Sequence, residues 1–288
     1  MENLPKKITT SLVCEAPFII PDVIKNSACL VGVDEAGRGP MVYSVFVCAL
    51  DEEESLKQQP FADSKTLSEK ERDDIYNNCV ENESSKFWWV VKVLTPQDIS
   101  NSMLRRSKYN LNELSHDTVI ELFRYLISKG INVKKAFVDT VGGPESYEKK
   151  LSSFFPNIKI TVSKKADSIY PIVSGASIVA KVTRDYVLKN WVMREKTQVS
   201  DLYGSGYPGD PKTIQWLHDS MNPLFGFPDI IRFSWATTAK LLDEKCIKVE
   251  WPPIEENEPK KKKVKSTVVQ MEKSYEDPFH EFLGLSFT

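Results

Sequence analysis

Two apolar stretches, separated by only a few residues, constrain the fold of this chain more than any other part of its sequence. The run CLVGVDEAG, from Cys29 to Gly37, predicts a buried strand because its apolar residues are nearly continuous. A turn containing Gly39 and Pro40 follows, and MVYSVFVCAL then predicts a second strand. Because the connection is so short, we expect the two strands to form a hairpin.

The remaining elements predict an α/β protein. Ser68 and Glu71 have the spacing of a capping box, so we expect a helix from there to about Glu81. Further along, helical spacing alternates with short runs of aromatic and β-branched residues, which favour strands. This order indicates a mixed five-stranded sheet flanked by helices. We expect further strands at 86–94, 136–143 and 158–162, and further helices at 111–129, 147–154, 170–191 and after Pro211.

The composition argues against several kinds of site. The formal net charge is −2, so nucleic-acid binding would have to use a local basic patch. The five cysteines form no C-x-x-C pair and there are three histidines, which argues against a zinc site and a disulfide framework. No apolar run approaches the ~20 residues of a membrane helix, so we expect a soluble protein of a reducing compartment.

Four carboxylates stand where a charge is costly. Asp34 and Glu35 close the first strand, Asp139 closes the strand AFVD, and Asp167 comes just before a helix. A carboxylate at the end of an apolar strand is partly desolvated and needs a partner. If the four converge, a hard divalent cation such as Mg²⁺ relieves their repulsion, because it prefers oxygen ligands. Two such ions suit phosphodiester hydrolysis. Several acidic side chains are needed to hold the ions, and the reaction does not need a histidine.

Each of these residues also has a simpler interpretation. Asp167 is equally compatible with a helix cap, and Asp139 with a strand-end turn. Glu35 is compatible with a solvated position, since neighbours on a regular strand point to opposite faces. Asp34 and Glu35 face one site only if the backbone twists at the glycines, and the glycines by themselves favour a tight hairpin turn.

Longer motifs carry a resemblance to a known family. GVDEAGRGP, from Gly32 to Pro40, resembles the signature of the ribonuclease HII family. Other segments resemble its eukaryotic catalytic subunits, in the family's order, so that the likeness covers about Cys29 to Lys245. These segments are DSKTLS (63–68), KYNLNELSHDT (108–118), FVDTVG (137–142), KADSIYPIVSGASIVAKVTRD (ending at Asp185), YGSGYP (203–208) and FGFPDIIRFSW (225–235).

The resemblance implies a ribonuclease H-like catalytic core at 29–200 and a helical C-terminal extension at 201–250. It implies an endonuclease that hydrolyses the RNA strand of RNA/DNA hybrids and incises duplex DNA 5′ of embedded single ribonucleotides. The family works with two Mg²⁺ ions, with Mn²⁺ as a substitute, and leaves 5′-phosphate and 3′-hydroxyl ends. Residues 1–28 are an N-terminal lead in this scheme.

The resemblance also implies roles for individual residues. The four acids, Asp34, Glu35, Asp139 and Asp167, correspond to the family's catalytic, metal-binding residues. The loop of Gly37, Arg38 and Gly39 corresponds to the one whose backbone recognises the ribose 2′-hydroxyl, a group that distinguishes RNA from DNA. Tyr207 corresponds to the tyrosine that packs on the sugar; this residue and the loop argue against a junction resolvase of the same fold.

Three basic residues beside these motifs are candidates for contacting phosphates. Lys65, Lys181 and Arg184 could follow a nucleic-acid backbone without reading its sequence. Arg184 has the strongest family match. For the two lysines a solvated helix face is an equally good interpretation. Ser177 and Thr183 are expected to pack or cap locally, without a chemical role.

One segment departs from the family pattern. The family's DEAGRGP continues through a few residues to a second Gly-Pro, whereas here Pro40 runs directly into MVYSVF, as though about four residues were missing. A shorter turn could shift the register of the second strand, and a slip of one residue reverses the face of every side chain. The alternative function is therefore a catalytically impaired scaffold that binds hybrid and partner subunits.

The C-terminal sequence suggests partners and a location. Residues 251–288 are expected to form a linker and a tail, partly disordered, because WPPIEENEPKKKKVK combines prolines with a lysine run. PKKKKVK resembles a nuclear localisation signal, although a solvated charge run is the simpler interpretation. The family implies nuclear heterotrimers with two non-catalytic subunits, which the tail is expected to help bind.

Overall fold

The computed structural model describes residues 4–5, 7–37, 39–61, 67–81, 86–140, 142–194, 200, 203–204, 206 and 209–248. The chain divides into two units, Met1–Lys248 and Val249–Thr288, and the second lies outside the described residues. So do the lysine run and the rest of the expected tail. The first unit contains all of the described helices and strands.

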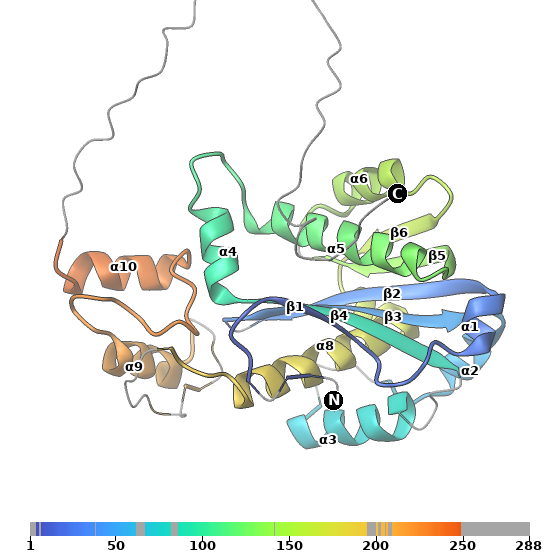
Figure 1. The fold of residues 1–288 in the computed structure, drawn as a ribbon, viewed down its shortest axis with the longest axis horizontal. Helices are drawn as coiled ribbons and strands as arrows, with labels where there is room; N and C mark the ends of the chain where they lie inside the picture. The colour runs from blue at the N-terminus through green and yellow to red at the C-terminus, as the bar shows by residue number, and fades with distance from the viewer. Residues whose placement is uncertain are drawn as a thin grey trace, which may run out of the picture. The chain divides into compact units, whose positions relative to one another are not determined.

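A mixed sheet forms the centre of this unit (Figure 1). Among the described residues it has six strands in the order β1-β4-β3-β2-β5-β6. β1, β4, β3 and β2 are antiparallel neighbours, whereas β5 and β6 run parallel to β2. The strands are β1 (Leu12–Glu15), β2 (Ala28–Gly37), β3 (Met41–Ala49), β4 (Phe87–Leu94), β5 (Asn132–Asp139) and β6 (Lys159–Ser163).

The five expected strands are all present, and β1 is an addition. β1 lies in the N-terminal lead and pairs with β4, which places it at the edge of the sheet. It has four residues, with only Cys14 buried, so it lacks the continuous apolar run that identifies an interior strand. The mixed α/β architecture is as expected.

Helices cover both faces of the sheet (Figure 1). α3 begins at the expected capping box, in which the Glu71 N–H donates to Ser68 Oγ and the Ser68 N–H donates to the Glu71 carboxylate. None of the described helices combines the length and apolar character needed to cross a membrane. The helices are α1 (Asp22–Asn26), α2 (Glu53–Lys57), α3 (Glu69–Ile75), α4 (Pro96–Met103), α5 (Leu111–Ser128), α6 (Pro144–Phe154), α7 (Ala166–Ile169), α8 (Pro171–Lys189), α9 (Pro211–Ser220) and α10 (Ala236–Lys245), with the 3₁₀ turn η1 (Leu50–Glu52) and the π-helical η2 (Tyr76–Glu81).

α8 packs on β2 and β3, and α5 and α6 lie on the opposite side of the sheet (Figure 1). All nine residues of β3 are buried, as a strand covered on both faces requires. Gly32 in β2 lies directly under α8: a Cβ added there would lie 2.2 Å from the carbonyl oxygen of Ile172. The glycine therefore allows the helix and strand backbones to approach.

The C-terminal extension has its own small apolar cluster. Trp216 and Leu217 of α9, Leu241 of α10, and Phe227 and Ile230 between them are buried together. Several polar contacts attach this cluster to the core. The Trp191 indole donates to Asp229 Oδ1 at 2.9 Å, and the Phe233 N–H donates to Ser100 Oγ of α4 at 3.0 Å.

We predict that Gly32→Ala destabilises the protein by about 3 kcal/mol, because the new methyl group forces α8 away from β2. For a protein of this size that corresponds to a fall of roughly 6–12 °C in the midpoint of thermal unfolding, measurable by circular dichroism. Gly209→Ala is the control, since a Cβ at Gly209 meets nothing within 4 Å. Equal midpoints for the two variants would contradict the prediction.

Candidate active site

Asp34 is buried near the end of β2 and faces α8. It is 4% exposed, and its Oδ1 accepts a hydrogen bond from the Glu35 N–H at 2.7 Å. Burial raises the pKa of Asp34 to about 7; Lys181 and a hydrogen bond from Ser177 act to lower it, and nearby Asp139 raises it further. Burial therefore works against the charged form of this carboxyl.

Asp139 and Asp167 adjoin Asp34 through the parallel pairing of two strands. Val33 of β2 lies opposite Val138 of β5, so an acid follows next on each strand. Asp139 Oδ1 accepts a hydrogen bond from the N–H of Ala166, the first residue of α7, at 2.8 Å. Asp167 is the next residue and is 2% exposed. Three of the expected acids thus come from neighbouring segments at one edge of the sheet.

Glu35 lies on the other face of β2. The antiparallel register pairs Asp34 with Ser44 and Glu35 with Tyr43, and β2 continues as a regular strand to Gly37. Burial raises the pKa of Tyr43 and of Tyr147 on α6, and the negative charge of Glu35 raises both further. Within the described parts of the chain, no group of three or more Asp, Glu, His or Cys residues is arranged to hold a metal ion. The assignment of all four acids as ligands stays a prediction.

The turn between β2 and β3 is held against the C-terminal extension. Gly37 pairs with Met41, so only residues 38–40 close the hairpin. Gly39 has φ +110°, a conformation that strongly favours glycine, and a Cβ there would lie 2.6 Å from the Ile230 carbonyl oxygen. Despite the short connection, β3 pairs with β2 along its whole length. Arg38 of this loop lies outside the described residues.

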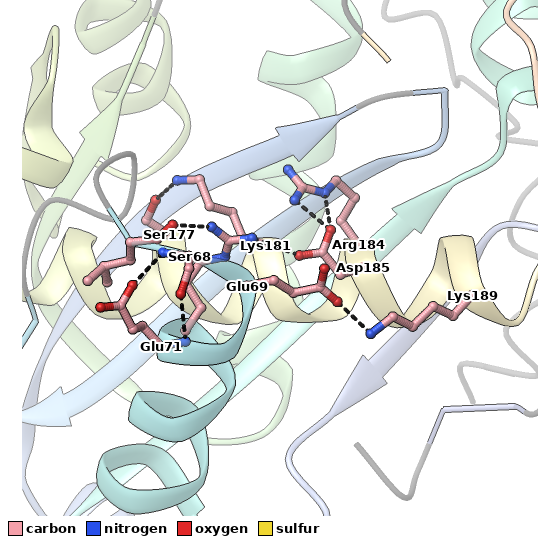
Figure 2. Close-up of polar contacts among 10 residues, drawn as sticks. Ser68, Glu69, Glu71, Ser177, Lys181, Arg184, Asp185 and Lys189 are labelled. Atoms are coloured by element: carbon pink, nitrogen blue, oxygen red, sulfur yellow. Dashed lines mark hydrogen bonds and ion pairs between the residues drawn. The ribbon is translucent and has the colours of Figure 1, made fainter. Parts of the chain in front are cut away.

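The two described basic candidates both have partners within the protein. Figure 2 shows Lys181 and Arg184 on α8: Lys181 Nζ donates to Ser177 Oγ at 2.6 Å, and Arg184 donates to Asp185 Oδ1 at 2.6 and 2.9 Å. Arg72 of α3 forms a further ion pair with Asp185, at 3.1 Å. The Arg184 side chain is 3% exposed, so this cluster fastens α3 to α8 rather than presenting a charge to solvent. Lys65 and Tyr207 lie outside the described residues.

Sequence reasoning missed two side chains beside the acids. Ser177 was expected only to pack or cap, yet it hydrogen-bonds Asp34 and receives the Lys181 ammonium. Its spacing of four residues from Lys181 on a helix was a usable signal. Tyr43, which pairs with Glu35 in the register of β2 and β3, carried no signal, because an aromatic residue in a buried strand usually belongs to the core.

Comparison with known proteins places this geometry in a family. The model of "Ribonuclease HII" matches residues 31–238. The chain is 48% identical over 252 residues to a ribonuclease H2 subunit from Bos taurus, covering 86% of this chain and 84% of the bovine one.

Solved structures agree. Ribonuclease H2 from Pyrococcus horikoshii matches with a TM-score of 0.58 and 28% identity, covering 75% of this chain and 98% of that one. Bst-RNase HIII in complex with Mn²⁺ matches with a TM-score of 0.52 and 18% identity, over 76% of this chain and 70% of that one, which shows a shared fold. With acids, hairpin and helical extension in the family's order, the chain belongs to the ribonuclease HII family and is a ribonuclease H.

Proposed function

We propose that the chain hydrolyses the RNA strand of RNA/DNA hybrids and incises duplex DNA 5′ of single embedded ribonucleotides, using two divalent cations. One observation carries the proposal: the buried Asp34 and the half-buried Asp139 adjoin at the ends of parallel strands, with Asp167 next to the residue that binds Asp139. This arrangement places the acids near the end of β2, which leads into the loop of Gly37, Arg38 and Gly39. Glu35 is the fourth proposed ligand.

The donor types of the proposed ligands are those that Mg²⁺ and Mn²⁺ prefer. All four proposed donors are carboxylates, which suit hard cations, and no cysteine or histidine is among them. The raised pKa of Asp34 shows that burial and the neighbouring Asp139 disfavour its charged form, a cost that a cation would offset. When bound, a pair of such ions activates a water molecule and stabilises the leaving oxygen.

The chain's own groups hold the carboxylates in place. Ser177 donates to Asp34 and is itself bound by Lys181, while the Ala166 N–H fixes one oxygen of Asp139. The backbone of Gly37, Arg38 and Gly39 is proposed to read the ribose 2′-hydroxyl, a donor and acceptor that DNA lacks. Tyr207 is proposed to pack on the same sugar. The products carry 5′-phosphate and 3′-hydroxyl ends.

The proposal extends to partners and location. The bovine relative is named as one subunit of its enzyme, and we propose that this chain likewise works with two non-catalytic subunits. The lysine run at 260–263 is proposed to direct the complex to the nucleus.

We predict that Asp34→Asn and Asp139→Asn each lower incision by at least about a hundredfold, because a neutral amide holds a divalent cation poorly. Folding should persist, since volume changes little and Asp34 no longer needs to be ionised in a buried site. The assay is Mg²⁺-dependent cutting of a duplex carrying one ribonucleotide, with the cut position mapped and partner subunits supplied.

Asp22→Asn, at an exposed position of α1, is the matched control and should keep full activity. Two results would refute the nuclease assignment: cutting by both variants at the wild-type rate, or hybrid binding without incision by the unmodified chain. The second result would instead select the scaffold function.

We predict that Arg184→Ala destabilises the protein by about 3 kcal/mol, because it removes a buried charge and leaves the half-buried Asp185 carboxylate with an incomplete set of partners. Urea unfolding measures this. The control Lys189→Met removes an exposed ion pair with Glu69 and should cost less than about 1 kcal/mol. A variant of wild-type stability, whose hybrid binding has a salt dependence weaker by about one phosphate contact, would instead make Arg184 a phosphate ligand.

A further inference from the structure

An open hollow lies where the β2–β3 turn meets the C-terminal extension. Gly39 of the turn lines one side of it, and Trp216, Ile230 and Trp235 of the extension line much of the rest. Arg232 is the charged residue among the described residues that line this mainly apolar hollow. The hollow therefore combines the turn proposed to recognise the sugar with a positive charge.

The backbone of Arg232 is fixed, whereas its charged end is largely uncommitted. Its carbonyl oxygen accepts hydrogen bonds from the Trp235 N–H at 3.2 Å and from Thr238 Oγ1 at 2.9 Å. Its guanidinium donates from Nη1 to the thioether sulfur of Met41 at 3.6 Å, and such a sulfur is a weak acceptor. Because a guanidinium has several N–H donors, most of its capacity is not used by the described parts of the chain.

Partial burial makes an unpaired guanidinium costly. Burial lowers the pKa of Arg232, which means that its surroundings disfavour the charge. A desolvated charge is normally paired, because its lost hydration has to be replaced. Arg184 follows this rule, since it donates to Asp185 Oδ1 at 2.6 and 2.9 Å. Arg232 forms no ion pair with a described carboxylate, so we expect its partner to be an anion from outside the chain.

We propose that Arg232 binds a backbone phosphate of the nucleic-acid strand whose ribose lies at the Gly39 turn. The proposal deepens the function proposed above and rests on it. The planar fork of a guanidinium matches two phosphate oxygens at once, and the bond is stronger away from bulk water. Every ribose of a strand adjoins a phosphate, so a sugar at Gly39 brings phosphates to the walls of the same hollow. Such a contact fixes the register of the strand without reading its sequence.

The experiment measures binding of the full 288-residue chain, with partner subunits supplied, to a fluorescent duplex that carries one ribonucleotide. Divalent cations are left out so that nothing is cut. Arg232→Gln should raise the dissociation constant about tenfold, because one charge-assisted contact is lost. The slope of log affinity against log salt should become shallower by about one. An all-DNA duplex of the same sequence should lose affinity by a similar factor, and a loss confined to the ribonucleotide duplex would overturn the phosphate assignment.

Two further variants separate the charge of Arg232 from its packing. Arg232→Lys keeps the charge and should keep the salt slope of the unmodified chain, although an ammonium lacks the fork geometry and binds less tightly. An equal loss of slope in Arg232→Lys and Arg232→Gln would overturn the proposal. Arg124→Gln is the matched control, because it also removes one cation. Arg124 is exposed on α5, over the ring of Phe154 and across the sheet from α8, and its variant should bind like the unmodified chain.

Thermal unfolding in inorganic phosphate, with chloride at the same ionic strength as reference, tests the site without nucleic acid. Phosphate should raise the unfolding midpoint of the unmodified chain more than that of Arg232→Gln. Equal shifts would overturn the anion site, and so would unchanged duplex affinity and salt slope in Arg232→Gln. If the phosphate shift depends on Arg232 but the unmodified chain does not bind the duplex, the function proposed above fails while the anion site is supported.

Discussion

The parallel pairing of β2 with β5 determines where chemistry can take place in this protein. It sets the buried carboxyl of Asp34 next to the half-buried carboxyl of Asp139 at the ends of the two strands, where burial raises the pKa of Asp34. Neighbouring groups stabilise these carboxylates. Lys181 and Ser177 from α8 act on Asp34, and the first N–H of α7 binds Asp139. The close packing of α8 on Gly32 lets Lys181 and Ser177 of that helix approach Asp34.

Residue patterns predicted the parts of the fold that depend on local or continuous signals. The buried strands, the β2–β3 hairpin and the capping box of α3 were all expected from their sequences and are confirmed. β1 was missed because it is short and half-exposed, so that its place at the edge depends on β4. The π-helical η2 was missed as well, since the regular helical spacing around Tyr76 predicted a continuous helix to about Glu81.

The candidate site likewise has features that could be predicted from the sequence and features that could not. That acids would gather at a strand end could be predicted, because carboxylates after apolar runs are unusual. Their distribution over the two faces of β2 could not, since it depends on whether the strand stays regular as far as Gly37. Arg184 shows a second limit of prediction from sequence, since its burial could not be predicted. A charged helical residue is usually exposed, and only the tertiary arrangement shows that Arg184 is buried and shares Asp185 with Arg72.

The contact between Gly39 and Ile230 has a consequence for how the protein is made. The hairpin that carries Asp34 and Glu35 is synthesised early, whereas the segment that its turn leans on leaves the ribosome much later. A nascent chain therefore has its acids before it has the support for its glycine turn. A truncation that removed Ile230 would leave this turn without its packing partner, even if the central sheet remained intact.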